Sequence, residues 1–180
     1  MLGNGRGQFG FPRAFNVGNG PAAVAVADLD GNGALDLVVA NANGDNLSIL
    51  MGNGDGTFKP QTQVSVGSIP LSVAAGDLNG DGVIDLVTAN SGNNSVAVMI
   101  GKGDGTFFAP VSYSVGSIPI AVGLADLTGD GSLDLVTANK GSQSASVLLA
   151  IGDGRFYNAV SYGLGGEPSA MVVTDMDNDL

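Results

Sequence analysis

The chain has 180 residues, 17 acidic and 6 basic side chains, a formal net charge of −11, and no cysteine or histidine. This composition excludes disulfides, thiol nucleophiles, histidine-containing catalytic triads, and metal sites built from histidine or cysteine. The sequence also lacks the clustered positive charge of a nucleic-acid surface, an apolar run of about 18 residues that would insert into a membrane, and the pattern of an uncleaved signal peptide.

A 49-residue repeat organises the chain. Each unit begins with a proline and carries an aspartate after its first apolar run, at Pro21, Pro70, Pro119 and Pro168 and at Asp28, Asp77, Asp126 and Asp175. Residues 21–69 and 70–118 are identical at 23 of 49 positions without a gap. The constant spacing indicates that each copy is one structural unit.

Within the first unit, short apolar runs predict four strands, around residues 23–27, 35–40, 47–51 and 58–66. Clusters of Gly, Asn, Asp or Pro bound each run, which is typical of strands joined by tight turns. Asn-Gly and Asp-Gly sequences supply the positive φ angles that hairpin turns need. Four antiparallel strands in each 49-residue unit predict an all-β fold, with each unit one blade of a β-propeller. The alternative, a β-solenoid, uses shorter repeats and fewer turns.

The repeat boundaries divide a single repeat domain, residues 1–180, into five parts. We expect the last strand of a preceding blade in residues 1–20, blade repeats in 21–69, 70–118 and 119–167, and a first strand with half an acidic loop in 168–180. The chain holds about 3.7 units (180 divided by 49), whereas propellers have 4–8 blades. We therefore expect a partial propeller, belonging to a longer protein or completed as a ring by further copies of the chain.

A nine-residue acidic loop follows the first run of each unit. Oxygen-bearing side chains stand at its positions 1, 3, 5 and 9, and glycines at positions 4 and 6 let the loop curl around a centre. Position 7 varies, which suits a ligand supplied by the backbone carbonyl. With oxygen ligands and three carboxylates per complete loop, the pattern favours Ca²⁺ over Mg²⁺ or transition metals. These loops hold 12 of the chain's 17 acidic residues.

Two other interpretations of the loop are weaker. An EF-hand needs a bidentate Glu at position 12 and flanking helices, whereas position 12 is Val39, Thr88 or Thr137 and predicted strands flank the loop. A plain turn explains one Asp-Gly or Asn-Gly sequence, but it does not explain three copies in register that each keep three carboxylates.

The pattern resembles the FG-GAP/VCBS repeat, which builds the β-propellers of integrin α-subunit heads and of many bacterial surface proteins. The resemblance rests on the Pro-x-x-Val-Ala-x-x-Asp strand, the Asp-x-Asp-x-Asp-Gly-x-x-Asp loop, and Gly-x-Gly-Asp-Gly-Thr-Phe at residues 52–58 and 101–107, and it covers essentially the whole chain. It implies calcium ligands at positions 1, 3, 5, 7 and 9, with position 7 binding through its carbonyl. The corresponding residues are Asp28, Asp30, Asn32, Ala34 and Asp36; Asp77, Asn79, Asp81, Val83 and Asp85; Asp126, Thr128, Asp130, Ser132 and Asp134; and, in the truncated fourth loop, Asp175, Asp177 and Asp179. The neutral side chains of Asn32, Asn79 and Thr128 depart from the family pattern and imply weaker sites.

The expected function is that of a non-enzymatic, extracellular calcium-binding module, secreted or at the cell surface, for adhesion or for recognition of a glycan or protein. No catalytic residue is assigned, because the acids outside the loops, such as Asp45 and Glu167, form no evident pair. Two alternatives stay open: the propeller domain of a calcium-dependent polysaccharide-acting enzyme, and a purely structural repeat of a large surface protein.

Overall fold

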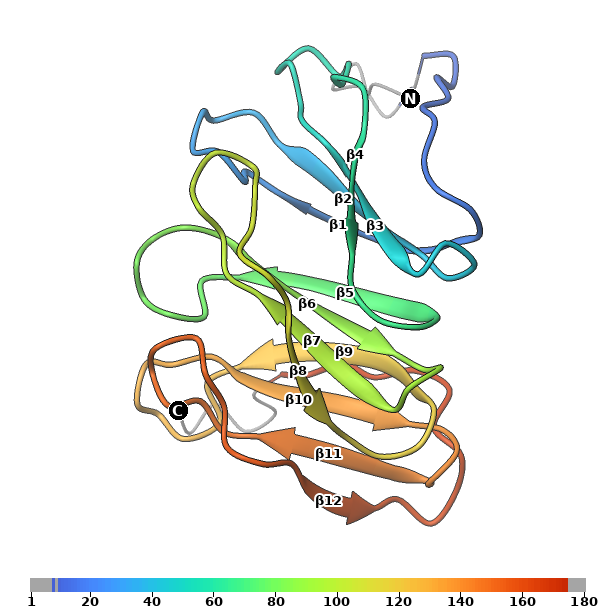
Figure 1. Ribbon diagram of the computed structural model, residues 1–180, viewed down its shortest axis with the longest axis vertical. Coiled ribbons are helices and arrows are strands. Elements are labelled where there is room, and N and C mark those ends of the chain that lie inside the picture. The colour runs from blue at the N-terminus through green and yellow to red at the C-terminus, as the bar shows by residue number, and fades with distance from the viewer. Residues whose placement is uncertain (1–7, 9, 175–180) are drawn as a thin grey trace.

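The computed structural model describes residue 8 and residues 10–174, and within them it contains twelve β-strands and no helix. The strands form three antiparallel sheets of four, each in chain order, called here blades 1, 2 and 3 (Figure 1). Blade 1 consists of β1 (Pro21–Ala27), β2 (Asp36–Asn41), β3 (Asn46–Leu50) and β4 (Thr62–Ser65). Blade 2 consists of β5 (Pro70–Gly76), β6 (Asp85–Asn90), β7 (Ser95–Met99) and β8 (Val111–Ser114). Blade 3 consists of β9 (Pro119–Ala125), β10 (Asp134–Asn139), β11 (Ser144–Leu148) and β12 (Val160–Gly163). The described part of the chain has no helix long and apolar enough to cross a membrane.

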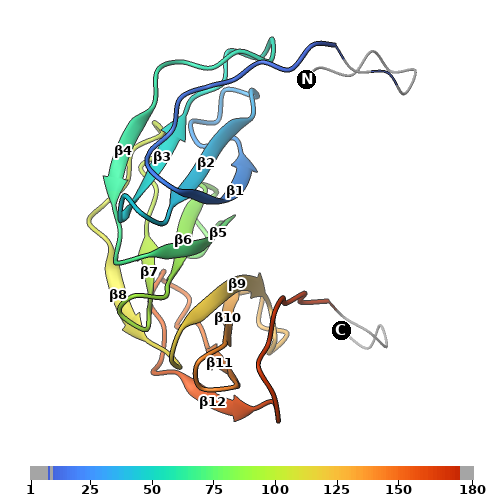
Figure 2. The same ribbon diagram turned by 90° about the vertical axis from the view of Figure 1, so that its right-hand side faces the viewer.

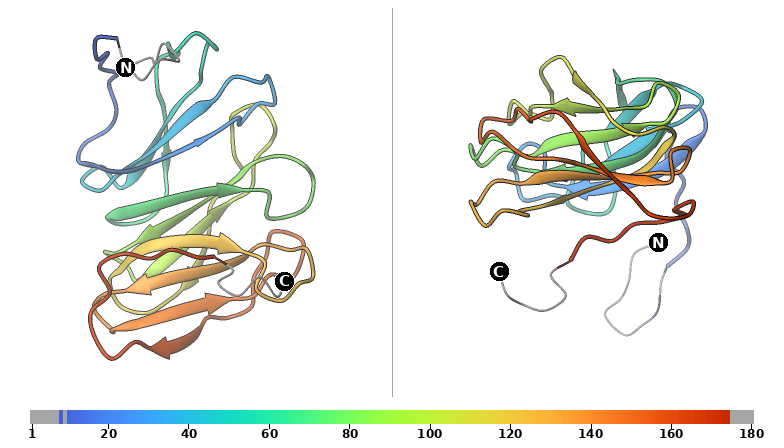
Figure 3. Two further views of the ribbon diagram at one scale, coloured as in Figure 1. Left: turned by 180° about the vertical axis from the view of Figure 1, so that it is seen from behind. Right: turned by 90° about the horizontal axis from the view of Figure 1, so that it is seen from below.

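The three blades stack face to face along an arc. The first strand of each blade (β1, β5, β9) lies on the concave side, and the last strand (β4, β8, β12) lies on the convex side (Figure 2). Seen from behind, the three first strands follow one another along the molecule (Figure 3). Consecutive blades of a propeller are arranged in this way around its axis. The predicted all-β fold of four-stranded, 49-residue blades is therefore confirmed, as a partial propeller.

Apolar middle strands hold the blades together. A strand covered on both faces of its sheet needs a nearly continuous apolar run instead of an alternating one. All six residues of β6 are buried, and successive apolar side chains pack against the two neighbouring blades in turn. Leu86 lies in the apolar cluster shared with blade 1, while Val87 and Ala89 lie in the cluster shared with blade 3. Burying a Leu or Val side chain contributes about 1.5–3 kcal/mol, so these stacked faces form the core.

The last strand of a blade is shorter than the sequence predicts. The run at residues 58–66 predicts one strand, but the structure has an isolated bridge between Gly52 and Phe58, followed by β4 at Thr62–Ser65. Pro60 lies between the bridge and the strand, and a proline has no N–H to donate to a ladder. The same break separates the Ala150–Phe156 bridge from β12 in blade 3, where no proline stands, so it is a property of the repeat and not of Pro60 alone.

The two end strands expected within residues 1–20 and 168–180 do not form in the described residues 10–20 and 168–174. A strand needs a hydrogen-bonded neighbour, and the middle strands of those further blades are not part of the described chain. The N-terminal segment nevertheless packs like the last strand of a preceding blade. Phe15 meets Phe58 edge-on at 5.0 Å, as Tyr113 of β8 meets Phe156 at 5.7 Å. The assignment of both ends to further blades stays a prediction.

Candidate metal centre

The acidic loops lie on one edge of the arc, at the left in Figure 1. Each joins the first strand of a blade to the second, and we call residues 28–36 loop 1, 77–85 loop 2 and 126–134 loop 3. The glycines at positions 4 and 6 have positive φ in all three, from 68° at Gly31 to 87° at Gly131. Other residues rarely adopt such angles, so these glycines shape the loop. The predicted ligands Asp175, Asp177 and Asp179 lie outside the described residues.

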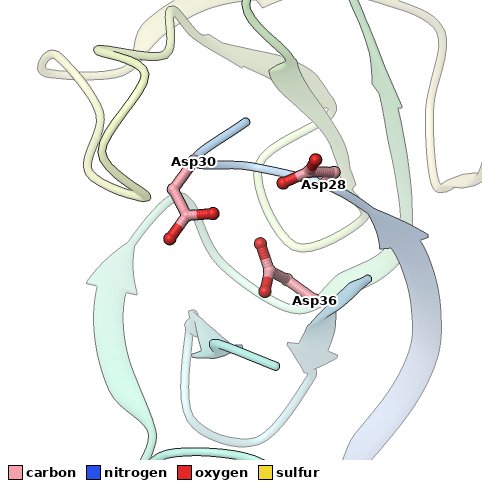
Figure 4. Close-up of side chains that lie close together, drawn as sticks. All are labelled: Asp28, Asp30 and Asp36. Atoms are coloured by element: carbon pink, nitrogen blue, oxygen red, sulfur yellow. The ribbon is translucent and has the colours of Figure 1, made fainter. Parts of the chain in front are cut away.

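Three carboxylates converge in loop 1. One oxygen from each of Asp28, Asp30 and Asp36 lies within 4.8 Å of the others. Figure 4 shows the three side chains around one shared space. Ca²⁺ binds oxygens at about 2.3–2.6 Å, so one ion placed between these oxygens can reach all three. The charges repel one another without a cation. Because the cluster offers only oxygen donors, it fits Ca²⁺ in the way that the sequence predicts.

The aspartate at position 9 also anchors the loop. Asp36 is fully buried, its Oδ2 accepts the Leu29 N–H at 2.8 Å, and its Oδ1 accepts the Gly52 N–H at 2.7 Å. The equivalent Asp85 and Asp134 accept the same two kinds of N–H in blades 2 and 3, at 2.7–3.0 Å. Sequence reasoning assigned position 9 to the metal alone and missed this structural role. The glycines at 52 and 101, in register with the aspartates, are its sequence signal.

The side chain at position 5 closes a small turn inside each loop. Its Oδ1 accepts the N–H of the residue at position 7, at 2.7 Å between Asn32 and Ala34 and at 2.8 Å for both Asp81 with Val83 and Asp130 with Ser132. Such Asx turns fix the backbone of the loop's second half without help from an ion. The loop is therefore largely preformed, which lowers the ordering cost of binding a cation.

The pKa shifts in opposite directions at a position-1 and a position-9 aspartate, Asp126 of loop 3 and Asp85 of loop 2. The Gly131 N–H, 2.8 Å from Asp126 Oδ2, is the main reason that the pKa of Asp126 lies below its ordinary value. Burial raises the pKa of Asp85 against the N–H groups of Gly101 and Leu78, and the nearby acids of loop 2 raise it further. The Asp126 carboxylate of loop 3 is thus held ready as an anionic ligand, whereas Asp85, the buried anchor of loop 2, ionises less readily without a cation.

Loops 2 and 3 differ from loop 1 at position 3. Among the described residues, three carboxylates come together within 4.8 Å in loop 1 alone. In loop 2 the Asn79 amide donates to Asp81 Oδ2 at 2.9 Å. In loop 3 the Thr128 hydroxyl lies 3.5 Å from Asp126 Oδ1. The ligand roles of these residues stay predictions, and the structure gives the clearest cluster to loop 1.

The repeat and the blades define a class of protein, the repeat-built β-propellers. A family profile described as an FG-GAP-like repeat matches residues 28–88, 77–137 and 126–180. These overlapping matches span most of the sequence, so the chain belongs to the FG-GAP-like repeat family, and the resemblance stated from the sequence is confirmed. A comparison with the curated proteins gives no match.

Solved structures share the architecture. An Agrocybe aegerita lectin that recognises non-reducing terminal N-acetylglucosamine is 24% identical, with a TM-score of 0.52 over 77% of this chain and 37% of the lectin. The chain thus spans little more than a third of that protein, and at this identity the likeness shows a common fold. Weaker likenesses are to the Photorhabdus luminescens Tc holotoxin pore (25% identity, TM-score 0.47, 78% of this chain and 7% of that one) and to the V. cholerae biofilm matrix protein Bap1 (18% identity, TM-score 0.43, 83% and 30%).

Proposed function

We propose that the chain is a non-enzymatic, calcium-stabilised propeller module that recognises a glycan or protein ligand outside the cell. The observation that carries the calcium part is the convergence of Asp28, Asp30 and Asp36 within 4.8 Å, in a family of repeats where such loops bind calcium. Extracellular calcium is millimolar, which suits loops that combine carboxylates with neutral oxygens. This supports a location outside the cell.

The calcium would be structural. It would lie between the start of the loop and the buried anchor at position 9, and so hold the first two strands of a blade at one end. A ligand that binds the native state alone stabilises that state by about 2.7 kcal/mol when its concentration is a hundred times its Kd. Several filled loops would add to one another, because their sites lie in different blades.

A thermal melt with and without chelator tests the calcium. We expect EDTA to lower the Tm by several degrees and added calcium to restore it. Asp28→Ala should reduce this calcium-dependent gain. Asp55→Ala removes the same charge from a turn outside the loops, and is therefore the matched control that should keep the gain. An unchanged melt in excess EDTA would refute a structural calcium ion.

Two acids outside the loops, Asp55 and Asp104, lack the raised pKa of a general acid. The Thr57 hydroxyl and N–H hold the pKa of Asp55 below its ordinary value, and Thr106 does the same for Asp104. A general acid needs a pKa raised toward neutrality, which is the opposite direction. Each of these aspartates instead closes its own turn, with the threonine N–H at 2.9 Å.

Glycan binding is the first form of recognition to test. The A. aegerita lectin supplies the first probe, a glycan that ends in N-acetylglucosamine, followed by an array of other glycans. We expect binding in calcium and its loss in EDTA. If no glycan binds the calcium-loaded chain, the glycan part of the proposal fails, and protein recognition or a structural repeat takes its place.

A further inference from the structure

The three loops share a backbone and hold three carboxylates each, but the carboxylates stand at different positions, and this difference bears on the order in which the loops take up calcium. Loop 1 has a carboxylate at position 3, Asp30, and loops 2 and 3 have Asn79 and Thr128 there. Position 5 is Asn32 in loop 1 and a carboxylate in the other two. The inference rests on the proposed calcium function and concerns the regulation of those same sites.

Loop 1 is open to a cation. Asp30 accepts a long hydrogen bond from the Asn32 N–H, 3.3 Å, and its carboxylate points to the space that it shares with Asp28 and Asp36 (Figure 4). A cation entering this space would meet three negative groups, of which Asp28 also accepts the Gly33 N–H at 2.8 Å. Within loop 1 the groups that donate to these carboxylates are backbone N–H groups, so calcium does not have to displace a side-chain donor there.

Loop 2 is closed by its own side chains. Asp81 uses both oxygens: Oδ2 accepts the Asn79 side-chain N–H at 2.9 Å, and Oδ1 accepts the Val83 N–H at 2.8 Å. The Asn79 N–H occupies a place on Asp81 where a cation would otherwise bind, since both are attracted to the same lone pairs. Calcium must break this hydrogen bond and turn the Asn79 carbonyl oxygen toward itself. A hydrogen bond to a charged acceptor is strong enough to weaken binding roughly tenfold.

Loop 3 offers calcium the least at position 3. The Thr128 side chain brings one neutral hydroxyl, 3.5 Å from Asp126 Oδ1. Asp126 already accepts N–H bonds from Gly129 at 2.7 Å and Gly131 at 2.8 Å. The position-3 ligand is thus short and uncharged. The amide bonds at position 1 recur at Asp28 and Asp77, so position 3 is what sets loop 3 apart.

We infer that the loops fill in the order 1, 2, 3 as calcium rises, and that the Asn79–Asp81 hydrogen bond is a latch that sets the higher threshold of loop 2. The protein then responds to calcium in steps: blade 1 is stabilised first, and blades 2 and 3 follow at higher concentration.

Glycine amides report each loop separately. The experiment is a calcium titration of the isotope-labelled, chelator-treated 180-residue chain, followed by NMR at Gly33, Gly82 and Gly131. We expect Gly33 to shift first, Gly82 at roughly tenfold higher free calcium, and Gly131 last. One common midpoint for all three would overturn the order while leaving the calcium function intact. No shift at any of them in millimolar calcium would instead refute the calcium function itself.

Substitutions at position 3 separate the latch from the charge. Asn79→Asp removes the donor and adds a carboxylate, and should lower the Gly82 midpoint at least tenfold without moving Gly33. Asn79→Ser removes the amide donor but adds no charge, so a lower Gly82 midpoint in this variant supports the latch and a higher one overturns it. Asp30→Asn is the matched control in loop 1, and it should raise the Gly33 midpoint toward that of loop 2.

Discussion

A buried hydrogen-bond network in blade 2 is incomplete, and one substitution should complete it. The second strand of every blade ends in a fully buried asparagine. In blade 3, Asn139 Nδ2 donates to Ser146 Oγ at 2.8 Å. In blade 2, the buried Nδ2 of Asn90 has no partner, because Ala97 stands where blade 3 has Ser146. Such an unpaired donor costs about 1–3 kcal/mol.

The substitution Ala97→Ser should therefore stabilise the protein. The new hydroxyl would accept the Asn90 N–H, and Ser112, which pairs with residue 97 across β7 and β8, offers an acceptor for the hydroxyl's own proton. Gly116 N–H donates to Ser146 in blade 3 at 3.1 Å, so the equivalent Gly67 N–H offers a second bond. Burying a hydroxyl offsets part of this gain. The net increase in the free energy of unfolding should be about 1 kcal/mol, or about 2–4 °C in Tm.

Denaturant unfolding at fixed calcium concentration measures this gain. Ala97→Val adds volume without a hydroxyl and should not stabilise the protein. The reverse change, Ser146→Ala, should destabilise blade 3 by a similar amount or more. The reasoning is refuted if Ala97→Ser is no more stable than the unmodified chain, or if its gain persists when Asn90 is replaced by Leu.

Two further predictions concern individual aspartates. Asp85→Asn should cost about 1–3 kcal/mol even in EDTA, because an amide offers one acceptor oxygen to two backbone N–H groups, and it should cost more in calcium, because Asp85 is also a predicted ligand. The exposed Asp81→Asn should reduce only the calcium-dependent part. Thermal melts of both variants in both buffers check this, and equal losses in EDTA would contradict it. Thr106→Val should raise the pKa of Asp104 toward its ordinary value, since the Thr106 hydroxyl is the main cause of its lowering. Because the pKa of Asp104 is lower in the folded state, the stabilisation by its hydrogen bonds to Thr106 is present above the unfolded pKa and is lost as the pH falls through the folded pKa. An NMR titration in which Asp104 keeps its lowered pKa in Thr106→Val would contradict the assignment.

The fold follows from short-range features of the sequence. The 49-residue period, the short apolar runs and the Asn-Gly and Asp-Gly turns act locally, so they predict the number and order of the strands in each blade. The exception is instructive. The run at residues 58–66 predicts one strand, but the structure divides it into a bridge at Phe58 and the short strand β4. Blade 3 has the same division between Phe156 and β12 without a proline, so a local proline does not explain it.

The candidate site was predicted less completely, because its second role depends on a contact across the blade. The spacing of loop 1 predicts the approach of Asp28, Asp30 and Asp36, which lie within nine residues of one another. It does not predict that Asp36 also accepts the N–H of Gly52, sixteen residues further on. Nor does spacing distinguish the open loop 1 from loop 2, where the Asn79 amide turns to its neighbour instead of the shared centre.

The anchor at position 9 explains why a metal in a surface loop should stabilise a whole blade. Asp36 holds the start of loop 1 through Leu29 and the start of the β3–β4 turn through Gly52, while its own backbone begins β2. A side chain at residue 52 would require the surrounding backbone to shift, since its Cβ would lie 2.3 Å from the Leu35 carbonyl oxygen. Three segments of the blade therefore meet at one buried carboxylate. A cation that offsets the cost of its buried charge strengthens all three together, so the effect of calcium should reach the sheet as well as the loop.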